Sequence, residues 1–173
     1  INGWAIAEKQ GYISQKEQMT QNFVQIKMPK LAKVNATAVK HNIIKSTGKP
    51  SQSYSLAGYD TVIGIIRNDL HTVYTMINSS GPQEIEILAN HASYDVKLFL
   101  IDDSDEIYGG YNFNWSYEEP TDNVKFHVLE QIPKPDFDRL QQDMSVQEIE
   151  QEFRIFTDMN NPDYLEYLEP EFS

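Results

Sequence analysis

The sequence feature that most constrains the fold is a strict alternation of large and small side chains at residues 111–117. Aromatic residues occupy every second position, with short polar residues between them: Tyr111, Asn112, Phe113, Asn114, Trp115, Ser116 and Tyr117. Successive side chains of a β-strand point to opposite faces. The alternation therefore predicts a strand with one dry face and one wet face.

The segment before this strand completes a hairpin. Residues 96–101 are apolar at nearly every position, as in a strand that is covered on both faces. The following Asp102-Asp103-Ser104-Asp105 favours a turn, because short acidic and hydroxyl side chains bond back to their own backbone. Residues 94–117 therefore predict a β-hairpin at the middle of an antiparallel sheet.

Other segments carry further strand patterns. Residues 61–67 and 72–78 are rich in β-branched side chains, and the short polar stretch between them predicts a second hairpin. Residues 31–45 favour one or two strands, and residues 124–129 favour another. Together these segments predict an antiparallel sheet of five or six strands.

Helices are expected before the sheet and within it. Ser14-Gln15-Lys16-Glu17 has the pattern of a capping box, in which each end side chain bonds the free backbone N–H of the other. Apolar residues follow at spacings of four and three, so a helix is predicted over residues 15–27, before Pro29. Apolar residues three positions apart predict a short helix over residues 83–91.

The character of the chain changes after residue 130. A stiff connector with two prolines is followed by apolar residues at helical spacing, which predict helices over residues 136–144, 145–156 and 163–168. A second capping box begins at Ser145, and Pro162 suits the first position of the last helix. We expect this acidic, amphipathic part either to dock on the sheet or to find its apolar partner on another molecule.

These patterns predict an α+β fold. It consists of an antiparallel β-sheet of five or six strands with an N-terminal helix, a short inserted helix and a helical acidic C-terminal part. We expect residues 1–130 to form the sheet core and residues 131–173 to form the acidic helical subdomain or arm. A chain of 173 residues is long enough to bury one such core, so both parts belong to one domain.

Charge is distributed unevenly along the chain, whose net charge is −12. Residues 1–50 carry eight Lys and two Glu, whereas residues 101–173 carry four basic and 19 acidic side chains. An acidic surface repels the phosphates of nucleic acids and anionic lipids, and it attracts basic protein surfaces. The alternative reason for the acidity is solubility alone.

Motifs for common chemistries are incomplete. Thr47-Gly48-Lys49 has neither the upstream glycine nor the following hydroxyl residue of a phosphate-binding loop. The acidic run at residues 102–106 does not have EF-hand spacing and is expected to form a plain turn. The sequence has no Cys, no close pair of His residues and no Gly-x-Ser-x-Gly motif. No cofactor is therefore expected.

One constellation suits metal-dependent hydrolysis. Asp95-Val96-Lys97 opens a strand of the central hairpin, and Asp69 lies in the preceding turn. Carboxylates on neighbouring strands hold Mg²⁺ in many nucleases, while a Lys orients the attacking water. The wide separation of the acids and the acidic balance of the chain oppose a nucleic-acid substrate. A metal-dependent hydrolase built on Asp69, Asp95 and Lys97 is therefore the second hypothesis.

The first hypothesis is a non-catalytic binding protein, such as an inhibitor, an immunity protein, an adaptor or a mimic of nucleic acid. Its acidic C-terminal face would engage a basic protein surface, with no direct contact to nucleic acid. The candidate partner-binding side chains are Glu148, Glu150, Glu152 and Glu166, which are expected on exposed helix faces. The third hypothesis is an extracellular or phage structural subunit.

The compartment and the assembly are less constrained. No apolar run reaches 18 residues, so no membrane-spanning helix is expected. A chain without cysteine fits the cytoplasm, which we favour, and secretion is the alternative if a leader precedes Ile1. The sequence leaves the oligomeric state open.

Overall fold

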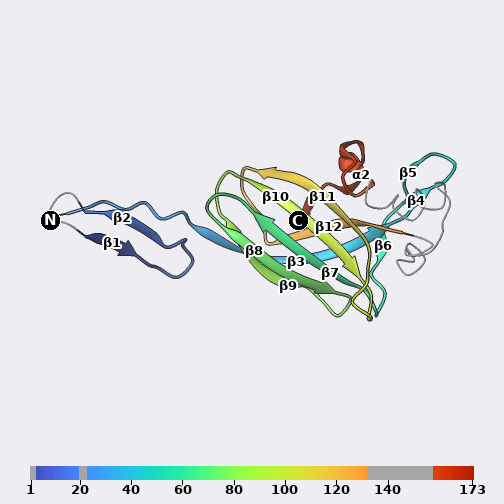
Figure 1. Cartoon of the computed structure of the whole chain (residues 1–173), viewed down its shortest axis with the longest axis horizontal. Helices are drawn as coiled ribbons and strands as arrows, with labels where there is room; N and C mark the ends of the chain where they lie inside the picture. Colours follow the sequence, from blue (N-terminus) through green and yellow to red (C-terminus); the bar gives the residue numbers. More distant parts are fainter. Residues whose placement is uncertain (1–2, 20–22, 132–157) are drawn as a thin grey trace, which may run out of the picture.

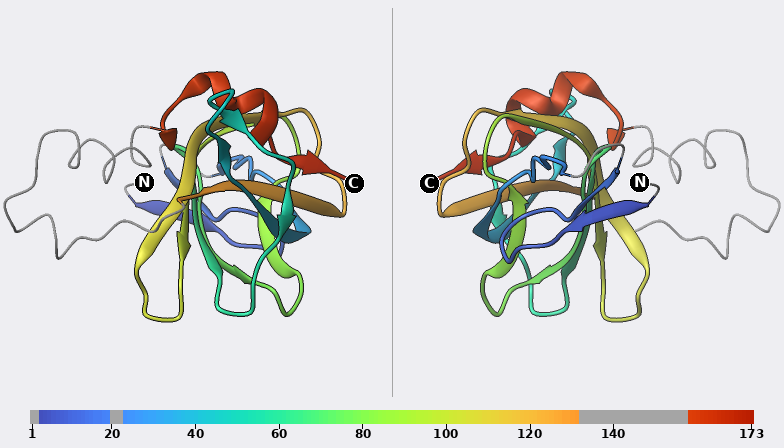
Figure 2. Two further views of the ribbon diagram at one scale, coloured as in Figure 1. Left: turned by 90° about the vertical axis from the view of Figure 1, so that its right-hand side faces the viewer. Right: turned by 90° about the vertical axis from the view of Figure 1, so that its left-hand side faces the viewer.

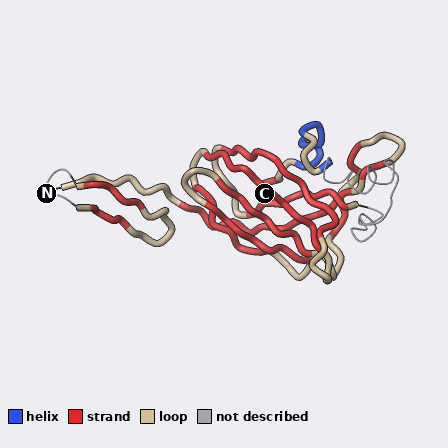
Figure 3. The backbone as a smooth tube through the Cα atoms, viewed as in Figure 1, coloured by secondary structure: helices blue, strands red, loops and turns tan. Residues whose placement is uncertain are grey.

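β-Strands dominate the computed structural model, which describes residues 3–19, 23–131 and 158–173 (Figure 3). Nine strands form one curled sheet that is the body of the molecule (Figure 1). They are β3 (Leu31–His41), β6 (Tyr54–Ser55), β7 (Thr61–Arg67), β8 (Thr72–Asn78), β9 (Gln83–Leu88), β10 (Ala92–Ile101), β11 (Ile107–Tyr117), β12 (Asn123–Glu130) and β13 (Glu171–Phe172). The fold is mostly β, so the predicted α+β fold is wrong.

Both predicted hairpins are present. β10 pairs with β11 in antiparallel register, with Tyr94 opposite Trp115 and Leu98 opposite Tyr111. β7 pairs with β8 and also with the free side of β10, so the two hairpins lie side by side in the sheet. Trp115 and Tyr111 are buried while Asn114 is exposed, which confirms the dry and wet faces expected from the alternation.

The sheet is mixed rather than antiparallel. The order of the main strands is β6-β3-β12-β11-β10-β7-β8, and β12 runs parallel to β3. β9 pairs with β3 and β13 pairs with β12. Because the sheet curls, β9 and β8 lie beside one another, and the end views show the strands wrapped around a common core (Figure 2).

Aromatic side chains of β10 and β11 form the centre of this core. Trp115 packs edge-on against Phe126 of β12, with ring centroids 5.5 Å apart. Two tyrosine hydroxyls reach across to the end of β9: Leu88 N donates to Tyr94 Oη at 3.0 Å, and Tyr117 Oη donates to Leu88 O at 2.6 Å. These bonds satisfy buried polar atoms and anchor β9 to the central hairpin.

The predicted N-terminal helix is wrong. Gln15–Gln18 forms the strand β2, which pairs antiparallel with β1 (Trp4–Ala7) in a separate two-stranded sheet. Phe23, which the predicted helix would have buried, is 78% exposed. A short helix needs a surface against which its apolar stripe can pack, and here the neighbouring strand supplies hydrogen bonds instead.

The predicted helix at residues 83–91 is also wrong, because Gln83–Leu88 is the strand β9. Ile85 and Ile87 are buried in the core, whereas Glu84 is exposed. This alternation has the period of a strand, and pairing with β3 buries the two β-branched side chains. Tertiary pairing overrides the helix propensity of the two Glu residues in this segment.

The described end of the chain is not a helical subdomain. A 3₁₀ turn at Pro162–Tyr164 continues into the single helical turn α2 (Leu165–Leu168), and the side chain of Asn161 accepts a hydrogen bond from Asp163 N at this start. Residues 158–173 pack on the body, where the Phe172 and Trp115 ring centroids lie 5.5 Å apart (Figure 2). The predicted helices at residues 136–144 and 145–156 lie outside the described residues.

Residues 3–19 and 23–30 form an arm that extends from the end of the body where β3 begins (Figure 1). The arm consists of β1, β2 and the extended segment of residues 23–30 that leads to β3, and β1 and β2 lie away from the nine-stranded sheet (Figures 1 and 3). At the base of the arm, Leu31 N at the start of β3 donates a hydrogen bond to Gly11 O at 2.7 Å. No helix among the described residues is long and apolar enough to cross a lipid bilayer.

Candidate functional site

The residues of the hydrolase hypothesis lie on the surface of the body. Asp95 and Lys97 are exposed on the outer face of β10, and Asp69 is exposed in the turn between β7 and β8. Asp95 pairs with Arg67 of β7 in the sheet register, so the residue that faces it on this strand is basic and not a second acid. In the part of the chain that the structure describes, no three His, Asp or Glu side chains are grouped to hold a metal ion.

The acidic partner-binding residues are only partly described. Glu148, Glu150 and Glu152 lie outside the described residues. Glu166 is exposed on α2, which packs against β12. The acidic run at residues 102–106 forms a turn in which Asp102 Oδ1 accepts from Ser104 N at 2.9 Å and from Glu106 N at 3.1 Å.

A buried polar cluster lies inside the body, at the end where β3 and β12 finish and β7 and β11 begin. Lys40 Nζ is 2.7 Å from Asp60 Oδ2 and 3.3 Å from Glu130 Oε1. Tyr108 donates a hydrogen bond to Asp60, and Tyr54 donates one to Glu130. Lys40, Asp60 and Glu130 are all buried, so five side chains from distant positions compensate one another's polarity in the core.

The protonation states in this cluster follow from its contacts. Burial lowers the pKa of Lys40, but its hydrogen bond to Asp60 and the charges of Glu130 and Asp60 outweigh this effect and raise the pKa above its usual value. Burial, together with hydrogen bonding to a carboxylate, also raises the pKa of Tyr54 and of Tyr108. A Lys that keeps its proton has no lone pair for attack or for proton abstraction. The cluster joins the ends of β3 and β12 to Asp60, which directly precedes β7.

A second buried pair lies on the opposite face of the same two strands. His41 Nε2 of β3 lies 2.8 Å from His127 Nδ1 of β12, and the two nitrogens share a hydrogen bond. His41 Nδ1 lies 2.7 Å from Ser51 O. His127 Nε2 lies 3.4 Å from Glu171 Oε1 of β13, but it makes no hydrogen bond. Burial and the nearby His41 lower the pKa of His127, whereas Glu171 opposes this shift.

The arm carries large apolar side chains that are exposed. Trp4, Ile6 and Phe23 are 57%, 65% and 78% exposed, respectively. Trp4 and Ile6 point to the same face of β1, and Lys16 Nζ lies 4.5 Å from the centroid of the Trp4 ring. The arm carries four Lys and two Glu, in contrast to the strongly acidic C-terminal part. It is an apolar and basic surface that reaches away from an acidic body.

Sequence reasoning missed both buried clusters and the arm. Lys40 and Glu130 are 90 positions apart, and no local motif joins them. One signal was present, because Val34, Ala36 and Ala38 place Lys40 on the inward face of a period-2 strand. A charged residue at an inward position requires a partner in the core. The arm had no comparable signal, because its residues also fit an amphipathic helix.

Comparisons of this chain with protein-family models, with curated proteins and with solved structures find no match. A function is therefore inferred from the residues and the geometry of the chain itself.

Proposed function

We propose that this protein is a non-catalytic binding protein that holds a partner protein through its N-terminal arm. The acidic body attracts a basic surface, and the arm supplies the apolar contacts. The observation that carries this proposal is the arm itself, which extends from the sheet with Trp4, Ile6 and Phe23 exposed (Figure 1).

Hairpin energetics support a bound arm. An isolated two-stranded hairpin is at best marginally stable in water, and three or more strands or a packing surface are needed to stabilise it. β1 and β2 pair only with one another in the described chain. The exposed aromatic residues are of the type that anchors protein interfaces, where a few large side chains supply most of the binding energy. A partner surface would cover these side chains and complete the arm.

The acidic C-terminal segment supports a basic contact on the partner. Asp163, Glu166, Glu169 and Glu171 are exposed within residues 158–173 of the docked segment. Complementary charge raises the rate of encounter more than the final affinity, and single exposed charges contribute at most about 1 kcal/mol. The acidity therefore steers the partner, while the arm holds it.

The test compares the partners of two triple variants of the tagged full-length chain. Trp4→Ser, Ile6→Ser and Phe23→Ser together remove the apolar side chains of the arm. The matched control changes three exposed apolar residues elsewhere, Ile44, Leu70 and Ile107, to Ser. Proteins captured from an extract of the source cells are identified by mass spectrometry, and each is then purified and its Kd measured directly.

We expect a partner that binds the wild-type and control chains and binds the arm variant at least about tenfold more weakly, as for loss of interface anchors. A second copy of this chain counts as a partner. An identical set of partners, with equal Kd values, for the arm variant and the control would overturn the proposal.

The hydrolase hypothesis has its own test. We expect the purified protein to leave single-stranded and duplex DNA and RNA uncut in the presence of Mg²⁺ or Mn²⁺. Cleavage that is lost in Asp95→Ala or Lys97→Ala would replace the binding proposal with a catalytic one. Cleavage that survives both changes would point to a contaminating nuclease, and repurification would then decide.

A further inference from the structure

The outer face of β7, β8 and β10 carries a contiguous apolar patch, which we call the outer patch. It consists of Ile63, Ile65, Tyr74, Met76 and Phe99. The sheet register places these side chains next to one another: Ile63 stands opposite Met76 and Phe99, and Ile65 stands opposite Tyr74. The inward neighbours of these residues fill the core, so the outer patch is a second apolar surface on the same strands.

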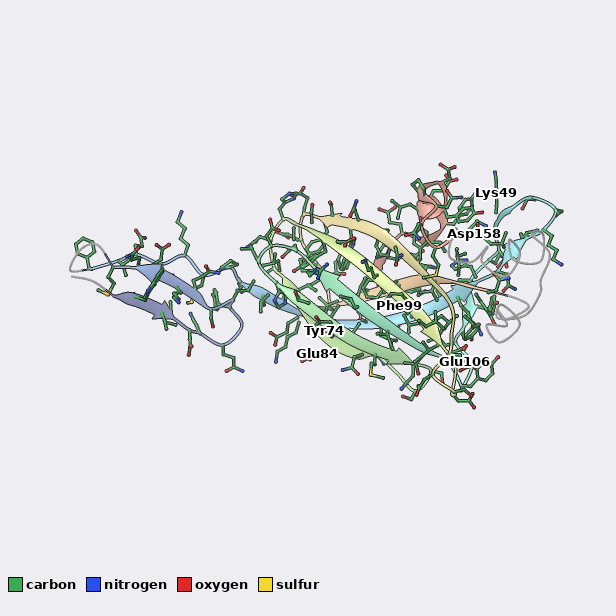
Figure 4. All side chains as sticks on the ribbon, in the orientation of Figure 1. Lys49, Tyr74, Glu84, Phe99, Glu106 and Asp158 are labelled. Atoms are coloured by element: carbon green, nitrogen blue, oxygen red, sulfur yellow. The ribbon has the colours of Figure 1, made fainter. Side chains whose placement is uncertain are left out.

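Two side chains of the outer patch are largely exposed to solvent in the described part of the chain. Tyr74 is 74% exposed and Met76 is 62% exposed, and both lie on β8 at the end of the strand order (Figure 4 labels Tyr74 and Phe99). Contiguous exposed apolar patches of this kind mark interaction sites, whereas scattered apolar residues do not. Met and Tyr are also enriched in the cores of protein interfaces.

Acidic side chains outnumber basic ones beside the outer patch. Glu84 and Glu86 lie on β9, which runs beside β8. Asp69 lies in the turn between β7 and β8, and Asp95 lies on β10. Arg67 and Lys97 are the basic residues on these strands. With four acids against two bases on these strands and their turn, the border of this apolar surface suits a ligand that is itself apolar and carries more Lys than acidic residues.

The arm has these two properties. Trp4, Ile6 and Phe23 supply apolar side chains, and Lys9, Lys16 and Lys27 supply the charge. At physiological salt, charges interact only over roughly 8 Å, so the local contact matters more than the net charge of two like-charged molecules. The arm points away from its own body, and it therefore meets the outer patch of another molecule rather than its own (Figures 1 and 3).

We infer that the partner of the arm is a second copy of this chain and that the outer patch is where the arm docks. This inference rests on the proposed function, because it identifies the partner that the arm holds. The acidic body and the basic arm are then complementary surfaces of one assembly, and the protein is a self-associating subunit. Burial of the arm against the patch covers the apolar side chains that the separate molecule leaves in water.

The test is photo-crosslinking of the full-length chain with benzoylphenylalanine in place of Ile6. Light and ¹⁵N-labelled copies are mixed in equal amounts, so that a crosslink between two molecules gives products of mixed isotope content. We expect mixed-isotope crosslinks from position 6 to residues of β7, β8 or β10. Sedimentation of the unmodified chain should show association that weakens about tenfold or more in Tyr74→Ser/Met76→Ser, as for loss of interface anchors. The control Ile44→Ser/Ile107→Ser changes two exposed apolar residues outside the outer patch and should associate as the wild type does.

Three results would overturn the inference: crosslinks within single molecules only, mixed-isotope crosslinks to another surface, or a chain that stays monomeric with no crosslinks. Normal association of the Tyr74→Ser/Met76→Ser variant would also overturn the inference. The proposed function fails only if no purified partner of any kind depends on the arm for binding. Its failure can therefore be distinguished from failure of the inference. Capture of a different arm-dependent protein would keep the proposed function and remove only the second copy as its partner.

Discussion

His41 Nε2 lies 2.8 Å from His127 Nδ1, and this contact determines which ring nitrogens carry protons. The carbonyl oxygen of Ser51 can only accept, so His41 donates to it from Nδ1. When His41 is neutral, its Nε2 accepts, and His127 therefore donates from Nδ1. His127 Nε2 then has no proton and faces the Glu171 carboxylate at 3.4 Å without a hydrogen bond.

This arrangement makes the stability of the fold depend on pH. Burial and His41 lower the pKa of His127 from its usual 6.5, with Lys125 adding to the shift and Glu171 opposing it. Below pH 6.5 the unfolded chain takes up a proton at this position that the folded chain resists. Stability from this residue is therefore complete above pH 6.5 and is lost as the pH falls toward the lowered pKa.

The measurement is the free energy of unfolding by urea between pH 8 and pH 5, about the range in which His residues titrate. We expect the loss of stability below pH 6.5 to be smaller in His127→Gln than in the wild type. His91→Gln is the control, because the His91 side chain is exposed. Equal pH dependence in the His127 variant and the wild type would contradict this account.

The buried ion-pair cluster should be sensitive to loss of its cation. Lys40→Met leaves Asp60 and Glu130 buried without a counter-charge, and we expect a loss of about 3–5 kcal/mol in the free energy of unfolding. Lys33→Met on the same strand is the control, because Lys33 pairs with Glu84 at 3.9 Å on the surface. That change should cost less than about 1 kcal/mol. Urea unfolding of both variants compares them, and similar losses would mean that the cluster is not a structural centre.

The two tryptophans lie in opposite environments and provide an internal comparison. Trp115→Ala removes a 4% exposed ring from the core and should cost about 3–5 kcal/mol, because the cavity cannot collapse fully. Trp4→Ala removes a 57% exposed ring from the arm and should leave stability nearly unchanged. Thermal or urea unfolding checks both changes. A large effect of Trp4→Ala on an isolated monomer would show that the arm packs on its own body.

The pairing of β11 with β12 depends on a glycine, a residue without a side chain. A Cβ at Gly109 would lie 2.0 Å from the backbone oxygen of Leu129, at the place where β11 and β12 pair. Gly109→Ala therefore forces the two strands apart, and we expect a loss of more than about 2 kcal/mol in the free energy of unfolding. Gly58→Ala is the control, because no atom lies within 4 Å of its added Cβ. Equal stability of the two variants would contradict the close approach of the two backbones at Gly109.

Local side-chain patterns were enough to predict the two central hairpins. The alternation around Trp115 and the β-branched runs before and after the turn at residues 68–71 each specify a strand period, and such patterns are short-ranged. The same kind of reasoning failed at residues 15–27 and 83–91. Both segments contain good helix formers with apolar residues at helical spacing, and nothing within them shows that a partner strand lies nearby.

What the sequence determined by itself is therefore the existence of the sheet, the two hairpins at its centre and the faces on which their aromatic residues lie. Only the tertiary structure decided the parallel pairing of β3 with β12, the meeting of Lys40 with Asp60 and Glu130, and the extension of the arm. The physical reason is range. Alternation and turn chemistry act between near neighbours, whereas strand order, buried charge pairs and uncovered surfaces depend on which distant segments pack together.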